Sequence, residues 1–338
     1  MTIEIAVGTH FPPLDTGPLL SSHVTRWCAA QENWDRIHYD LDYARNIAGL
    51  PYTIINGALK QHLLTESLSR AFGDSAWIWR LDFRFTGMDL VEDALRVEGA
   101  ISNIEEDQGV LRVGVELKIH NLRQEAITTE GAAIVLIRRD KAPVLDALSL
   151  FGDTLKQSPA DDAPDLPDSV RQRLGKQLSN VRSYSPVELG RLRLFAEAIM
   201  NVSPIHYDEV AGKASVHGGV VALPLFPIHA MSQKPGTLEL SRDRMAIGRE
   251  GVCEVGRNLA QLLGLPPQGL LNGGCQVQVH TLVRPDEYVQ ARSRLVGARR
   301  RSGRRGGDIL IYDTENTYET TDGRPLLTEV QSMVQRMN

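Results

Sequence analysis

Cysteine is scarce in this 338-residue chain: Cys28, Cys253 and Cys275 are the only three, and no two of them have a C-x-x-C spacing. An odd, widely spaced set of thiols is typical of a reducing compartment and excludes a disulfide-stabilised scaffold. Long apolar runs are also lacking, because stretches such as ALSLF fall far short of the roughly 20 residues that span a membrane. The N-terminus MTIEIAVGTHFPP has no basic segment followed by an apolar one, so no secretory signal is expected. These features predict a cytoplasmic protein without a membrane partner.

An excess of basic charge is lacking as well. The chain has 37 Lys and Arg residues against 42 Asp and Glu residues, which gives a formal net charge of -5. This mild acidity disfavours a general nucleic-acid binder, which needs a basic surface. A hydrophobic content of 42% and a charged content of 23% are typical of a globular protein, and the length is sufficient for two domains.

What the chain does contain is a pattern that occurs twice, Asn-x-x-x-Ile-His-Tyr-Asp. The copies are Asn33–Asp40 (NWDRIHYD) and Asn201–Asp208 (NVSPIHYD), so each lies early in its own half. A long internal period indicates duplication of a whole domain. We therefore expect a first domain over residues 1–150, a Pro-, Asp- and Ser-rich linker over 151–186, and a second domain over 187–338.

Each half is predicted to contain a long helix and then antiparallel strands. In the first half the helix is Ala58–Phe72, whose apolar residues recur on one face, with Asn56-Gly57 before it and Gly73 as its stop. Alternating apolar and polar residues predict strands over Ser75–Phe85, Ala94–Ile104, Val110–Asn121, Ala126–Arg138, Gln276–Val283, Glu287–Val296, Asp308–Tyr318 and Pro325–Val334. A short helix over Ser169–Leu178, a helical lead-in over Leu189–Met200 and a longer helical region reaching about Leu263 complete the second half. The predicted class is α+β, with two sheets that can pair edge to edge.

The duplicated motif, with a Gly-led helix behind its first copy, resembles the MaoC-like hydratases and dehydratases, the R-specific enoyl-CoA hydratase family. The matching residues are Asn33, Ile37–Asp40, Tyr43-Ala44, Gly49–Pro51, Asn56-Gly57, Phe195-Ala196, Asn201, Pro204–Asp208, Gly218-Gly219, His280, Arg284-Pro285, Gly303–Gly306 and Gly323–Pro325. The resemblance covers nearly the whole chain. It implies a double hotdog fold, in which two long helices are each wrapped by an antiparallel sheet and the sheets join in one chain. The first half looks most like the hydratase domain, and the second like its companion, a MaoC/FAS1-like dehydratase domain.

The resemblance also implies an acyl-thioester tunnel between the halves and reversible addition of water to a 2-enoyl-CoA. Histidine titrates near working pH, so His38 is the expected general acid/base. Most members of the family have an Asp five residues before this His, whereas this chain has Asn33 and, in the second copy, Asn201. A neutral amide cannot act as a base, but it can hold a water by hydrogen bonds. Asp35 and Glu32 are nearby carboxylates that could take the missing role.

The start of the first helix is the expected site for the thioester oxygen. The free N–H groups of a first helical turn and the helix dipole stabilise an anion, and glycine permits close approach. Gly57 is assigned this role, with Asn56 as a substrate-binding neighbour. His206 and Asn201 are second-site candidates, but the position equivalent to Gly57 by offset is Leu225, flanked by Pro224 and Pro227, and prolines have no N–H to donate.

Several alternatives stay open. Arg304 and Arg305 lie in the run GARRRSGRRGG, which either grips the phosphates of coenzyme A or forms a solvated hairpin. A His-x-Asp sequence is often only a hydrogen-bonding turn, in which Asp40 and Asp208 cap backbone groups. A metal site at His38 and Asp40 lacks a third ligand at suitable spacing, so no metal or redox cofactor is expected; coenzyme A enters only as part of the substrate.

Two other functions are compatible with the same residues. One is a hotdog acyl-CoA thioesterase, which attacks the thioester carbonyl. The other is a catalytically silent acyl-CoA-binding subunit, suggested by the absence of the acidic residue from both motifs. Self-association into a homodimer is also expected of such a chain.

Overall fold

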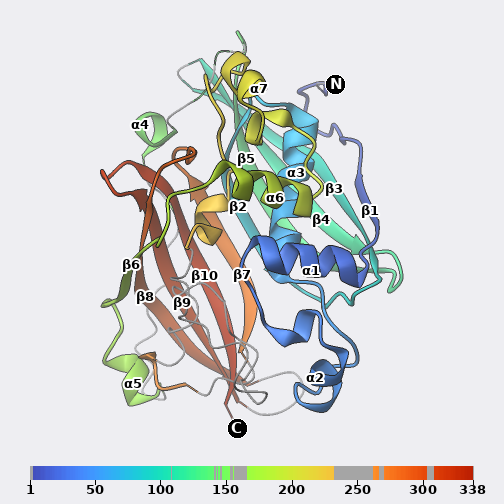
Figure 1. Ribbon diagram of the computed structural model, residues 1–338, viewed down its shortest axis with the longest axis vertical. Coiled ribbons are helices and arrows are strands. Elements are labelled where there is room, and N and C mark those ends of the chain that lie inside the picture. Colours follow the sequence, from blue (N-terminus) through green and yellow to red (C-terminus); the bar gives the residue numbers. More distant parts are fainter. Residues whose placement is uncertain are drawn as a thin grey trace.

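The computed structural model describes residues 3–107, 109–140, 142, 144, 147–152, 155, 166–231, 262–265, 270–302 and 308–337. Within these ranges ten strands form one antiparallel sheet, and helices cover part of it (Figure 1). Strand order is β1-β3-β4-β5-β2-β7-β10-β9-β8-β6, so the first half of the chain supplies five neighbouring strands and the second half the other five. The order within one half mirrors the order within the other, as expected of a duplicated domain.

The first half follows the predicted order of a motif loop, a long helix and a meander of strands. Its elements are β1 (Leu14–Pro18), α1 (Ser21–Ala30), η1 (Arg36–His38), α2 (Leu41–Asn46), α3 (Gly57–Phe72), β2 (Trp77–Phe85), β3 (Ala94–Asp107), β4 (Val110–Asn121), β5 (Ala126–Arg138) and α4 (Ala147–Phe151). Helix α3 lies along the strands of this half (Figure 1). Its apolar face, including Leu63, Leu64 and Leu68, is fully buried. The helix ends at Gly73, whose φ of 80° favours glycine.

The second half repeats this order in its described parts. Its elements are α5 (Asp168–Arg171), β6 (Gln177–Arg182), α6 (Leu189–Ala198), η2 (Pro204–His206), α7 (Glu209–Ala214), η3 (Phe226–His229), β7 (Leu270–Val279), β8 (Val289–Ser302), β9 (Asp308–Thr320) and β10 (Pro325–Met337). Helices α1 and α6, which precede the two motif copies, pack on each other, and the rings of Trp27 and Phe195 are 5.0 Å apart at this contact.

Strands β2 and β7 join the two sheets. Arg80 pairs with Gln278, Asp82 with Gln276 and Arg84 with Gly274, in antiparallel register. Each strand thereby covers an edge that would otherwise present unpaired backbone groups. The prediction that the two sheets pair edge to edge within one chain is confirmed.

Some sequence predictions need correction or stay open. The prediction of a helix over Ser169–Leu178 was wrong, because the helix is the shorter α5. The chain then forms β6, which lies inside the predicted linker and pairs with β8. Strand β7 begins and ends earlier than the predicted Gln276–Val283. The second long helix was predicted in the stretch that ends near Leu263, and most of that stretch lies outside the described residues. The domain boundaries remain a prediction. Among the described residues, no helix combines the length and the apolar character needed to cross a membrane.

Candidate active site

The first motif lines a cavity of about 490 Å³ whose walls come from both halves of the molecule. Its walls come from the loop and η1 that carry the first motif, from the start of α3, from the loop after β2, and from η3, β7, β9 and β10 of the second half. The predicted residues Asn33, Asp35, His38, Asn56 and Gly57 all line it. A cavity of this size is in the range that binds small organic ligands.

The His38 ring is fixed in one tautomer. Its Nδ1 lies 2.8 Å from the carbonyl oxygen of Ile54. A carbonyl can only accept, so Nδ1 carries the hydrogen, and Nε2 of the neutral ring is left with its lone pair. Burial lowers the pKa of His38 to about 4, against a weaker opposing effect of the bond to Ile54. Near neutral pH the ring is therefore uncharged, and Nε2 can accept a proton.

Asn33 and Asp35 differ in how far their side chains are already used. Asn33 Oδ1 accepts a 3.0 Å bond from the Asp35 backbone N–H, while no bond of its Nδ2 group is found in the described part of the chain. Asp35 caps η1, where its Oδ1 accepts from the Ile37 N–H at 3.3 Å. Asn33 can therefore offer a donor to a molecule in the cavity, whereas Asp35 is engaged in the local turn.

Helix α3 begins at Gly57 and directs its first turn at the cavity. The N–H groups of a first turn have no partner within their helix, and Gly57 and Ala58 both line the cavity. A Cβ at position 57 would come within 2.9 Å of the Phe85 ring, so glycine is required by packing as well as by ligand access. Asn56 is 1% exposed and contacts the Cys28 thiol at 3.7 Å. The carboxamide of Asn56 therefore lies at the cavity wall beside a thiol, and its contact with the substrate stays a prediction.

The second motif has the same turn but different surroundings. His206 Nδ1 lies 2.8 Å from the Val221 carbonyl oxygen, which again leaves Nε2 as the acceptor, and burial lowers the pKa of His206. Asn201, however, donates through Nδ2 to Glu66 Oε2 of α3 at 2.5 Å. At the sequence offset from His206 that Gly57 has from His38, the second half has Leu225 next to Pro224. Neither His206 nor Asn201 lines the cavity around His38. The two halves are therefore not equivalent.

The aspartates of both motifs are capping residues, as one interpretation of the sequence held. Asp40 accepts from the Tyr43 N–H at 3.0 Å and pairs with Arg36 at 2.6 Å. Asp208 accepts from the Ala211 N–H at 2.8 Å. Glu32 lies 3.8 Å from Arg191 and does not line the cavity.

The cavity also has ionisable side chains that the sequence did not indicate, namely Lys60, Asp89, His229, Tyr318 and Glu329. Lys60 lies on the first turn of α3 and forms a buried ion pair with Asp89 at 2.6 Å. Glu329, on β10, is 3% exposed and faces the same cavity from the second half. The sequence indicated only that Glu329 lies on the same face of its strand as the apolar Leu327 and Met333, because side chains alternate between the two faces of a strand. Nothing in the local sequence indicated that this face borders the cavity of the other half.

The arginine-rich run remains partly open. Arg299 pairs with Asp313 at 2.7 Å and Arg300 with Asp308 at 3.3 Å, across paired strands β8 and β9. Arg304 and Arg305 lie outside the described residues, so their contact with coenzyme A phosphates stays a prediction.

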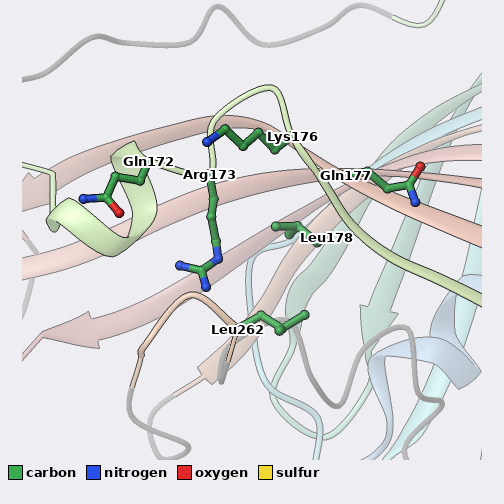
Figure 2. A pocket seen from close by; sticks show the side chains of 6 residues that line it. All are labelled: Gln172, Arg173, Lys176, Gln177, Leu178 and Leu262. Atoms are coloured by element: carbon green, nitrogen blue, oxygen red, sulfur yellow. The ribbon is translucent and has the colours of Figure 1, made fainter.

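A second hollow, of about 310 Å³, lies where the chain passes from α5 to β6 (Figure 2). It is lined by Gln172, Arg173, Lys176, Gln177, Leu178 and Leu262. This lining contains no histidine, cysteine or carboxylate, so the hollow lacks the chemistry of the His38 cavity.

Two family models of dehydratase domains match parts of this chain. "Hydroxyacyl-thioester dehydratase type 2" matches residues 15–92, which include the first motif and the start of α3. "FAS1-like, dehydratase domain region" matches residues 174–329, which include the second motif. Together the two matches include both copies of the motif, so the resemblance to thioester dehydratases inferred from the motifs is confirmed. A comparison with curated proteins gave no significant match.

Solved structures show the same fold at low sequence identity. A putative MaoC domain protein dehydratase from Chloroflexus aurantiacus J-10-fl is 11% identical, with a TM-score of 0.67, over 98% of this chain and 96% of that one. A conserved hypothetical protein from Mycobacterium tuberculosis, described as a double hotdog fold, is 14% identical, with a TM-score of 0.61, over 97% and 96%. A protein described as a MaoC-like dehydratase is 13% identical, with a TM-score of 0.61, over 98% of each chain. The double hotdog fold is therefore confirmed.

Proposed function

We propose that this chain is a hydro-lyase that reversibly adds water to the double bond of a 2-enoyl-CoA thioester. The observation that carries the proposal is the meeting of three groups in one cavity: the bare Nε2 of His38, the Nδ2 group of Asn33 and the N-terminal turn of α3. Hydration of a conjugated thioester needs a base, a held water and a stabilised oxyanion, and these groups supply one each.

In the hydration direction, His38 Nε2 takes a proton from a water that Asn33 holds, while the water oxygen bonds to C3 of the enoyl group. The C2–C3 π electrons move toward the thioester carbonyl, whose oxygen becomes negatively charged. The first N–H groups of α3, near Gly57, stabilise that charge. The imidazolium then returns the proton to C2, and its low pKa of about 4 makes it a ready donor. One water has been added and His38 is neutral again; dehydration is the reverse.

The Asn33 amide and the backbone N–H groups donate hydrogen bonds but do not take up or release a proton near neutral pH. His38 is therefore the single proton carrier in this scheme. Coenzyme A takes part only as the thiol portion of the substrate, and no other cofactor is invoked. The second half lines the cavity from β7, β9 and β10, so we assign it the binding of the acyl group.

The test is product analysis with purified protein and a set of 2-enoyl-CoA thioesters of varied length and bulk. The absorbance of the conjugated enoyl group is expected to fall, and mass spectrometry is expected to find the substrate mass plus one water without release of a free thiol. Stoichiometric free CoA would instead identify a thioesterase. Tight binding without any turnover across the set would identify a silent acyl-CoA-binding subunit.

A further inference from the structure

The wall of the cavity supplied by the second half is polar. Of the seven cavity residues that come from β7, β9 and β10, five carry hydrogen-bonding side chains and two are apolar. The polar ones are Asn272, Asn316, Tyr318, Glu329 and Gln331, and the apolar ones are Leu271 and Met333. A tunnel for a plain alkyl chain is expected to be lined by apolar groups, because each unpaired polar group that it covers loses its bonds to water. This composition therefore calls for an explanation.

The centre of this wall is the carboxyl group of Glu329. Its Oε1 accepts two hydrogen bonds, from Asn316 Nδ2 at 2.9 Å and from the Tyr318 hydroxyl at 2.8 Å. Asn316 is itself held by the Ser293 hydroxyl at 2.6 Å, so the cluster is braced across β8, β9 and β10. Among the described residues Oε2 receives only the Cys275 thiol, at 3.4 Å, and a thiol is a weak donor. Oε2 is thus the oxygen with remaining hydrogen-bonding capacity.

No cation pairs with Glu329 among the described residues, although the side chain is only 3% exposed. Burial raises the pKa of the Glu329 carboxyl, against the opposing effects of its three donors. A protonated carboxyl whose Oε1 is already occupied by two donors carries its hydrogen on Oε2. Such a group donates one O–H bond and can still accept, which suits an uncharged partner with an oxygen atom.

We propose that the wall formed by β9 and β10 is a subsite for a hydroxyl or keto oxygen on the acyl group of the thioester, with Glu329 as the residue that selects for it. This inference rests on the proposed acyl-CoA substrate and adds the chemical class of the acyl group. Glu329 and Tyr318 come from the second half, whereas His38 and the start of α3 come from the first, so we place this oxygen on a part of the acyl group other than the reacting carbons. A site built to hydrogen-bond a substrate oxygen rejects the analogue that lacks it, since its own polar groups are then left unpaired.

The test measures binding and does not depend on turnover. Two series of saturated acyl-CoA thioesters of matched lengths, one ending in a methyl group and one in a hydroxyl group, are titrated calorimetrically into the full chain. At the length that reaches β10, wild type is expected to bind the hydroxyl form about tenfold more tightly, the equivalent of about 1.4 kcal/mol. Glu329→Leu is expected to abolish or reverse this preference. Glu329→Gln, whose carboxamide still donates and accepts, is expected to keep most of it.

Met333→Leu is the matched control, because it exchanges one apolar side chain of the same wall for another and is expected to leave the ratio unchanged. If Glu329→Leu does not fold, the flexible and unbranched Glu329→Met takes its place. Equal binding of both series at every length in wild type overturns the inference while the proposed function stands. Failure of both series to bind overturns the acyl-CoA proposal itself, and this inference with it.

Discussion

Asn201 of the second motif donates a 2.5 Å hydrogen bond to Glu66, which lies on the helix of the first half. The side chain of Glu66 is only 2% exposed and also pairs with Arg70 at 2.7 Å. The corresponding amide of the first motif, that of Asn33, is directed to the cavity. One amide of the duplicated motif thus fastens the two halves together, and the other is available to a ligand.

This difference predicts opposite responses to the same substitution. Asn201→Asp places a second carboxylate against buried Glu66, and like charges in a buried site destabilise the fold. We expect a loss of about 2 kcal/mol or more in the free energy of unfolding, visible as a lowered Tm near neutral pH. Asn33→Asp restores the residue common in the family and is expected to leave Tm almost unchanged while activity is kept or raised.

Asn33→Leu removes every hydrogen bond to the water and is expected to abolish most activity. Full activity in Asn33→Leu would remove Asn33 from the site.

The two histidines provide a second comparison. We expect His38→Ala to lower turnover of 2-enoyl-CoA by at least about 100-fold, the lower end of general acid–base contributions. His206→Ala is expected to change turnover far less, because His206 does not line the His38 cavity. Circular dichroism and Tm establish that both variants fold. A crippled His206→Ala beside a mild His38→Ala would reverse the assignment of the active half.

Gly57 can be tested against a glycine that has room. In Gly57→Ala the new methyl group meets the Phe85 ring at 2.9 Å and stands beside the first-turn N–H groups, so turnover is expected to fall by at least about tenfold. Gly190→Ala is the matched control, since Gly190 lies in α6, is exposed and has no atom within 4 Å of an added Cβ. That variant is expected to keep wild-type kinetics and a Tm equal to or slightly above wild type. Unchanged turnover in Gly57→Ala would exclude the helix start from oxyanion binding.

Buried histidines predict sensitivity to acid. His62 is fully buried against Trp27, Phe195 and His229, and burial, with a smaller effect of His229, lowers the pKa of His62 well below 6.5. The unfolded chain therefore takes up a proton as pH falls through about 6.5 while folded His62 stays neutral, so stability decreases with falling pH in that range.

The variant His62→Phe removes this proton uptake and fits an aromatic environment. Its free energy of unfolding, relative to wild type, is expected to improve on going from about pH 8 to about pH 5, as measured by urea unfolding at each pH. Replacement of the exposed His10 by Gln is the control, and it should leave the pH dependence of wild type unchanged. An identical pH dependence in His62→Phe and wild type would show that His62 does not contribute to acid unfolding.

Local sequence was sufficient for much of this architecture. The bounds of β4 and β5 agree with the prediction, and α3 begins one residue earlier than predicted. Alternation and helical periodicity determine these elements because each presents one face to a core, and the duplicated motif identified the halves and His38. The predicted extent of the short helix before β6 was wrong, because the pairing of β6 with β8 outweighs the local helix propensity of that segment.

The composition of the site required the tertiary structure. The sequence by itself determined that each half carries a histidine in the same Ile-His-Tyr-Asp motif, and that only the motif of the first half is followed by a helix that begins with glycine. The tertiary structure decided that Asn201 serves as a bridge to Glu66 and that Glu329 shares a cavity with His38. The physical reason is that these partners are separated by more than a hundred residues and meet because the two halves pack together, through the pairing of β2 with β7 and the contact of α1 with α6. Hydrogen bonds and burial that arise from such a junction leave no periodic signal in the chain.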